Sequence, residues 1–171
     1  KVIGLGAVAG IVAALVELGL DRFPAFHAGG IAGAAAASFI QVAPVEELCK
    51  LAVVLLFVWK NPNFNEENDG IVYLGASAIG FALLENIAYV VDAGIGTGIL
   101  RAFTAIPLHV FTAVVLGLFV GRARFESRSE TRTALIAAGL AIAWLIHGAY
   151  DTLVMSGSAL ALLLLPLVGG L

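Results

Sequence analysis

Long apolar runs, separated by short charged or Gly-, Pro- and Asn-rich segments, make up most of the chain. A helix needs about 20 apolar residues to cross the roughly 30 Å hydrocarbon core of a bilayer, and most of these runs reach that length. The pattern predicts spans at about 2–20, 30–59, 70–92, 101–121, 133–155 and 158–171. The predicted fold class is therefore all-α, a polytopic transmembrane helical bundle of about six spans, formed by a single domain over residues 1–171.

The second run is too long for a straight span. At a rise of 1.5 Å per residue, residues 30–59 would measure about 45 Å. The run must tilt strongly, project into water or break near Pro44, because proline lacks the N–H that a helix interior uses. The sequence leaves open whether this run is one helix or two. The last run, 158–171, is short enough to be truncated or only partly embedded.

The composition agrees with an integral membrane protein. The 171 residues are 61% hydrophobic and only 12% charged, whereas about a quarter of the residues in soluble domains are charged. The net charge of −3 comes without a basic patch, so no nucleic-acid partner is expected. Cys49, the single cysteine, allows no disulfide within the chain. Because the chain starts at Lys1 and its one methionine is Met155, we expect the native N-terminus to lie upstream.

The placement of lysine and arginine predicts the orientation, because cytoplasmic loops are enriched in these residues. With six alternating spans, one side receives only Arg22 and Arg101, whereas the other receives Lys1, Lys60, Arg122, Arg124, Arg128 and Arg132. We therefore expect a multi-pass protein whose N-terminus and whose loops at 60–70 and 121–132 lie in the cytoplasm.

Polar residues also lie inside the predicted spans, where a charge near the bilayer centre costs at least a few kcal/mol. They are Glu46, Glu47 and Lys50 in the second run, Glu85 and Asn86 in the third, His109 and Thr112 in the fourth, and His147, Tyr150 and Asp151 in the fifth. Glu46 and Lys50 are four residues apart, as are His147 and Asp151, so each pair shares a helix face.

These residues lie at similar depths. Counting from the ends of the spans places Glu85, His109 and His147 about 10 to 14 Å below the same, external membrane face. Glu46 joins them if the second run is kinked near its proline. A single buried pair is ordinarily structural, but carboxylates and histidines at one depth favour a functional site. Glu17, close to the end of its span, is interpreted as interfacial.

Four short motifs carry a resemblance to a known family. "EELCK" at 46–50, "FALLEN" at 81–86, "PLH" at 107–109 and "HGAYD" at 147–151 together resemble the PrsW family of intramembrane proteases, which is similar to the CAAX prenyl proteases and the bacteriocin-processing relatives. The resemblance implies a prokaryotic membrane enzyme that hydrolyses a peptide bond near the external membrane face. Its implied partners are the lipid bilayer and a membrane-anchored protein substrate such as an anti-sigma factor.

The resemblance also implies roles for individual residues. Glu46 corresponds to the general base that activates water, with Glu47 supporting it. Glu85 and His147 complete the implied catalytic set. Glu85 stands where the CAAX proteases have histidine. The supporting residues are Lys50, Asn86 and Asp151.

Two mechanisms remain open. Glu85, His109 and His147 can supply three ligands to a zinc ion, with Asp151 orienting His147 and Glu46 acting as the base. Without a metal, Glu46 and Glu85 would both act on the water while His147 stabilises the oxyanion. The additional histidine, His109, favours the metal.

A different class of function uses the same residues. Buried carboxylates and histidines are also typical of proton- or cation-coupled transporters, which are the alternative function. The small size of the chain and its single asymmetric cluster count against a transporter. A scaffold that binds a partner helix without catalysis ranks last, because the implied catalytic set is complete. The signatures HExxH, GxSG and GxGD of other membrane proteases are absent from the sequence.

Overall fold

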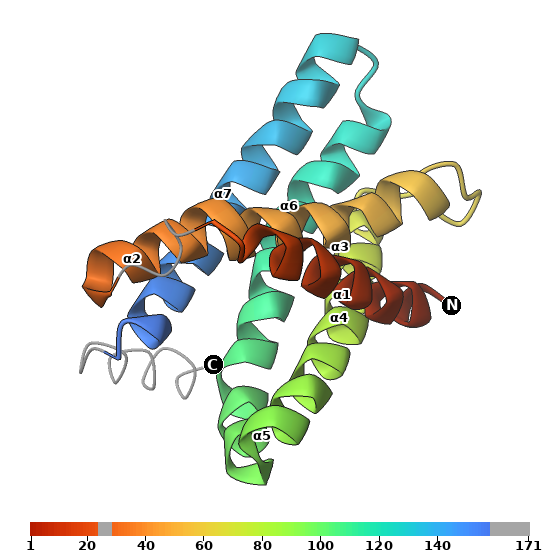
Figure 1. Cartoon of the computed structure of the whole chain (residues 1–171). Helices are drawn as coiled ribbons and strands as arrows, with labels where there is room; N and C mark the ends of the chain where they lie inside the picture. Colours follow the sequence, from red (N-terminus) through yellow and green to blue (C-terminus); the bar gives the residue numbers. More distant parts are fainter. Residues whose placement is uncertain (24–28, 158–171) are drawn as a thin grey trace.

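The computed structural model describes residues 1–23 and 29–157, and within them every regular element is a helix, which confirms the all-α class (Figure 1). The elements are, in chain order, α1 (Val2–Leu20), α2 (Gly30–Ala36), the π-helical segment η2 (Ala37–Val42), α3 (Ala43–Phe57), α4 (Asp69–Ala93), α5 (Ile95–Phe103), α6 (Ala105–Phe125) and α7 (Ser129–Met155).

Four helical stretches of the described chain are long and apolar enough to cross a membrane. They are Val2–Leu20, Asp69–Ala93, Ile95–Phe125 and Ser129–Met155. These stretches confirm a membrane protein and correspond to the first, third, fourth and fifth predicted runs, but they do not confirm the predicted count of about six. The second run is divided among α2, η2 and α3, the longest of which has 15 residues. The last predicted run, 158–171, lies outside the described residues.

The second run is one continuous helical stretch, because α2, η2 and α3 follow one another without a loop (Figure 1). The π-helical turn precedes Pro44, where the Ala43 N–H donates to the Ser38 carbonyl five residues earlier. Pro44 explains this change, since its ring would press on the Ile40 carbonyl in a regular α-helix and it has no N–H to offer that carbonyl. A local π-helical turn therefore replaces the expected kink or break.

Helix α7 holds the π-helical segment in place. The Trp144 indole N–H donates to the Phe39 carbonyl at 2.8 Å. The Phe39 ring also lies over Gly148, where an added Cβ would come within 2.6 Å of the ring. These two contacts fix the position from which α3 starts, and α3 carries Glu46 and Glu47 in its first turns.

Glycines allow the long helices to approach closely, as small residues do in membrane bundles. A Cβ at Gly80 of α4 would overlap the Ile3 carbonyl of α1, and a Cβ at Gly6 would overlap the Ser77 carbonyl. On the other side of α4, a Cβ at Gly117 of α6 would press on the backbone of α4. The close packing of α1, α4 and α6 gives a rigid frame for the polar side chains described below.

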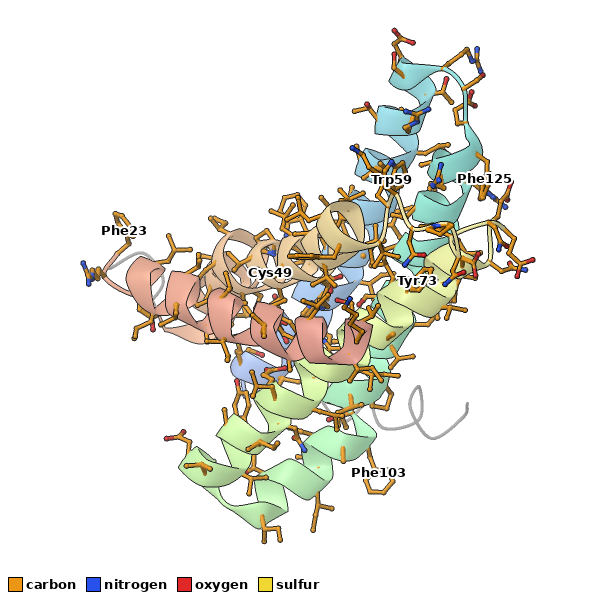
Figure 2. The ribbon with its side chains drawn as sticks, turned by 90° about the vertical axis from the view of Figure 1, so that its right-hand side faces the viewer. Phe23, Cys49, Trp59, Tyr73, Phe103 and Phe125 are labelled. Carbon is orange, nitrogen blue, oxygen red and sulfur yellow. The ribbon has the colours of Figure 1, made fainter. Side chains whose placement is uncertain are left out.

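The two ends of the α4–α6 pair differ. At one end, Phe64 of the 58–68 loop packs against the rings of Trp59, Tyr73 and Phe125 (Figure 2). At the other end, α5 joins α4 to α6, and Figure 2 shows its Phe103 projecting outward, 69% exposed. The polar residues gather between α5 and the middle of the bundle.

Candidate active site

The buried polar residues meet in one cavity of about 280 Å³ that is bounded by α1, α3, α4, α5, α6 and α7. Concave sites with a few converging polar groups are the usual places for substrate binding and catalysis. The polar residues that line the cavity are Glu17, Glu46, Glu85, Tyr89, Arg101, His109, His147, Tyr150 and Asp151.

The cavity lies toward one end of the bundle. Glu85 lies about two turns before the end of α4, His109 about one turn after the start of α6, and His147 about two turns before the end of α7. These three helix ends belong to the same side of a bundle whose neighbouring helices run in opposite directions. The three residues therefore lie at a similar level of the bundle, while their depth below a membrane face stays a prediction.

Glu47 and Lys50 lie behind the cavity wall, and both side chains are fully buried. Oε1 of Glu47 lies 2.6 Å from Lys50 Nζ and 2.8 Å from His147 Nδ1, and it accepts a hydrogen bond from Thr112 Oγ1 at 3.1 Å. Lys50 thus pairs with Glu47, three residues away, and not with the predicted partner Glu46. A carboxylate oxygen only accepts, so Nδ1 of His147 carries the proton and its Nε2 faces the cavity.

His109 lies between a cation and a carboxylate. Its Nδ1 is 3.0 Å from Lys50 Nζ, and its Nε2 is 2.9 Å from Glu85 Oε2. An ammonium group only donates and a carboxylate only accepts, so the proton of His109 resides on Nε2 and Nδ1 offers a lone pair. The ring stands edge-on to the ring of His147, with the two centroids 5.0 Å apart.

Glu46 completes a compact group with the two histidines. Its Oε2 lies 3.8 Å from His109 Nδ1 and 3.7 Å from His147 Nε2. This oxygen is buried without a hydrogen-bond donor. One potential ligand atom from each of the three residues lies within 4.8 Å of the others. The arrangement can hold a metal ion.

The compact group contains Glu46, whereas Glu85, the predicted third ligand, contacts His109 at the nitrogen on the other side of the ring. Both oxygens of Glu85 are engaged elsewhere, with Arg101 at 2.5 Å and with the far nitrogen of His109. Sequence spacing cannot distinguish these arrangements, because all of the carboxylates lie at similar depth. The choice between Glu46 and Glu85 as a metal ligand depends on which nitrogen of His109 each carboxylate contacts: Glu46 lies near Nδ1 and Glu85 near Nε2.

The predicted supporting residues have different surroundings. Asp151 Oδ2 lies 3.2 Å from His147 Nε2, on the cavity side of the ring, so Glu47 rather than Asp151 holds the far nitrogen of His147. Asn86 donates from Nδ2 to the Gly98 carbonyl of α5 at 3.2 Å. Asn86 therefore connects α4 to α5.

The sequence analysis missed two residues that line the cavity. Glu17, interpreted as interfacial, has a buried Oε1 without a hydrogen-bond donor. Gln41 fixes this part of α1 by donating from Nε2 to the Glu17 carbonyl at 3.1 Å and to Asp21 at 2.8 Å. Arg101, interpreted only as a charge near a span end, reaches back to Glu85. No periodic signal separates α5 from α6 in this apolar region, so the inward direction of Arg101 could not be predicted.

The charges that line the cavity are unbalanced. Four carboxylates face it, from Glu17, Glu46, Glu85 and Asp151, against one permanent cation, Arg101. Buried charges are tolerated when they are paired or when they coordinate metals. Protons on some of these carboxyl groups, or a bound cation, would balance the excess.

Comparisons with known proteins identify one family. The family model described as PrsW family intramembrane metalloprotease matches residues 1–171. A protein named Protease PrsW from Geobacillus kaustophilus is 36% identical over 128 residues, which cover 75% of this chain and 56% of that protein. The Protease PrsW of Bacillus subtilis is 33% identical over 75% of this chain and 59% of its own length. The one from Clostridioides difficile is 30% identical over 94% of this chain and 68% of its own length.

The chain thus spans little more than half the length of the first two of these relatives. No solved structure matches it.

Proposed function

Because this chain belongs to the PrsW family of intramembrane metalloproteases, we propose that it hydrolyses a peptide bond in a membrane-anchored protein. The observation that carries the proposal is the buried group of Glu46, His109 and His147 in a cavity between apolar helices. The substrate is a single-span or anchored protein such as an anti-sigma factor, cut near the external face. A coupled transporter is not favoured, because the matched family and the curated relatives are proteases.

The residues present fit a metal ion. Glu46 offers an oxygen without a donor, and each histidine has a carboxylate on its other nitrogen, Glu47 at 2.8 Å for His147 and Glu85 at 2.9 Å for His109. Such carboxylate–histidine pairs orient the histidines of metal sites. Nδ1 of His109 lies 3.0 Å from Lys50 Nζ, so a bound ion would replace the ammonium as the partner of this nitrogen. We propose Glu46, His109 and His147 as the ligands, and zinc as the ion, because imidazole and carboxylate ligands suit it. When bound, the ion supplies a Lewis acid for the water and the scissile carbonyl.

Glu46 is central to both mechanisms. With a metal, its free oxygen serves as a ligand. Without a metal, the same oxygen lies 3.7 Å from His147 Nε2 and serves as the base that takes a proton from water. The positive charge of Lys50, 2.6 Å from Glu47, offsets one of the remaining carboxylates in either case. Glu47 and Glu85 then act by holding the two imidazole rings.

The test combines metal content with cleavage. We expect purified protein to contain about one zinc ion per chain by plasma mass spectrometry, and His147→Ala to lose it. A chelator should abolish cleavage of a membrane-anchored substrate, and zinc should restore it. Glu46→Gln should reduce cleavage by about 100-fold or more, a typical loss for a catalytic proton-transfer group.

The matched control is Glu66→Gln, which changes an exposed carboxylate in the 58–68 loop. It should leave both metal content and cleavage unchanged. Cleavage by metal-free protein would replace the metal mechanism with the glutamate-only one. Full cleavage by Glu46→Gln would contradict both mechanisms.

A further inference from the structure

Helix α5 contributes one side chain to the cavity, that of Arg101. The helix follows Gly94, whose φ of +86° favours glycine. Its outer surface is apolar and exposed, and includes Ile99, Leu100 and Phe103 (Figure 2). Arg101 is the charged residue of α5, and it points inward, toward α4, with only 16% of its side chain exposed.

Two adjacent residues of α4 hold α5 in place. Asn86 donates to the Gly98 carbonyl, and Glu85 accepts from Arg101 at 2.5 Å. Gly98 lies so close to Val90 that a Cβ at this position would overlap the valine side chain. The backbone of α5 is therefore fixed within one turn of Arg101.

The contact between Arg101 and Glu85 continues to His109. Glu85 accepts a hydrogen bond from the guanidinium at Oε1 and from His109 Nε2 at Oε2, so each carboxylate oxygen has one partner. The guanidinium also stacks on Tyr89, with its carbon 3.6 Å from the ring centre, which limits its freedom to leave the carboxylate. Nδ1 of His109 then faces Lys50 and Glu46.

We propose that Arg101 is a positioning residue that acts through Glu85 on His109. By holding one oxygen of Glu85, it directs the other oxygen to Nε2 of His109 and so fixes the orientation of the ring, whose Nδ1 faces Lys50 and Glu46. The catalytic importance of this arrangement rests on the proposed function, but the effect on the histidine does not. The sequence FALLEN thus ends in Glu85 and Asn86, which both contact α5, and Glu85 also contacts His109 of the site.

The first measurement reads the histidine directly in metal-free protein. Nitrogen-15 NMR of histidine-labelled protein in lipid nanodiscs distinguishes the two ring tautomers of His109, and His27→Gln removes one of the other two histidine signals. We expect the Nε2–H tautomer in the wild type, because Glu85 and Lys50 both favour it. In Arg101→Gln we expect a shifted Nε2 signal, because Glu85 then loses the partner that holds its other oxygen. Arg101→Lys should restore part of the wild-type signal, because its ammonium keeps the charge but lacks the planar stacking surface. Arg22→Gln, at an exposed arginine of the α1 end, should leave the signal unchanged.

The second measurement tests whether Arg101 acts through Glu85. Arg101→Gln should weaken zinc binding and lower kcat by about 10-fold each with little change in KM, the usual effect of losing an outer partner of a ligand. The double variant with Glu85→Gln should be no worse than Glu85→Gln alone. An additive loss in the double variant would overturn the proposal.

The outcomes separate this proposal from the proposed function. If Arg101→Gln changes the His109 Nε2 signal and zinc binding but the wild type cleaves no substrate, the protease function fails and the positioning role stands. If the wild type cleaves and Arg101→Gln leaves the His109 signal unchanged, the positioning role is wrong. Should Arg101→Gln fail to fold, Tyr89→Leu keeps the charge and removes the stacking surface. We expect a smaller shift of the same Nε2 signal, and an unchanged signal in that variant overturns the proposal.

Discussion

At the scale of single residues, Lys50 contacts His109 of α6 directly and is linked to His147 of α7 through Glu47. Its fully buried ammonium contacts Glu47 at 2.6 Å and His109 Nδ1 at 3.0 Å, and lies 5.1 Å from the centre of the Phe81 ring. The sequence placed Lys50 on the same helix face as Glu46, but spacing does not choose between partners three and four residues away. His147 and Thr112 decide the choice, because both contact the same oxygen of Glu47 as Lys50 does.

Removing this cation should therefore cost stability. We expect Lys50→Met to lower the free energy of unfolding by about 3 to 5 kcal/mol, because it leaves a buried carboxylate without its counter-charge. Denaturant unfolding of the protein in detergent micelles measures the loss. Lys60→Met, at an exposed lysine beyond α3, is the control and should change stability little. Equal effects of the two substitutions would contradict a buried ion pair.

At the scale of elements, the positions of the long helices could be predicted but their irregularities could not. The apolar runs predicted α1, α4 and α7 closely, because a membrane requires helices of a set length. The predicted start of the fourth span at residue 101 placed Arg101 at the membrane edge, whereas α5 begins at Ile95 and turns Arg101 inward. The inward direction of Arg101 and the π-helical turn at Ala37–Val42 depend on contacts with neighbouring helices. The local sequence pattern does not predict such contacts.

The π-helical turn gives the element-scale prediction. Gly148→Ala should disturb η2, because the new Cβ would approach the Phe39 ring to 2.6 Å and displace the start of α3. We expect a loss of about 1 to 3 kcal/mol in stability, typical of overpacking, together with reduced cleavage. Stability and cleavage are measured together in micelles.

Gly75→Ala is the matched control. It makes the same chemical change in a helix at a position with nothing within 4 Å of the added Cβ. It should be neutral or stabilise by up to about 1 kcal/mol, because alanine favours helix more than glycine does. Equal losses at the two glycines would show that contact with Phe39 is unimportant.

At the scale of the whole molecule, two loops that are far apart in sequence lie at the same end. α3 carries the chain from the cavity to the 58–68 loop, where Phe64 packs on Phe125 at the end of α6, and Arg124 lies 5.8 Å from the centres of the Trp59 and Phe64 rings. The 58–68 loop, which contains Lys60, and the 121–132 segment, which contains four arginines, both lie away from α5 (Figure 1). The basic residues concentrate at the end that the predicted orientation places in the cytoplasm.

This arrangement predicts the sidedness of the cavity. On a Cys49→Ser background, Asn63→Cys marks the 58–68 loop and Gly96→Cys marks α5, where an added Cβ meets nothing within 4 Å. In intact spheroplasts, a membrane-impermeant maleimide should label Gly96→Cys at once and Asn63→Cys only after permeabilisation, because basic loops stay in the cytoplasm. The reverse pattern would place the cavity in the cytoplasmic half of the membrane, and the substrate bond would then have to lie there too.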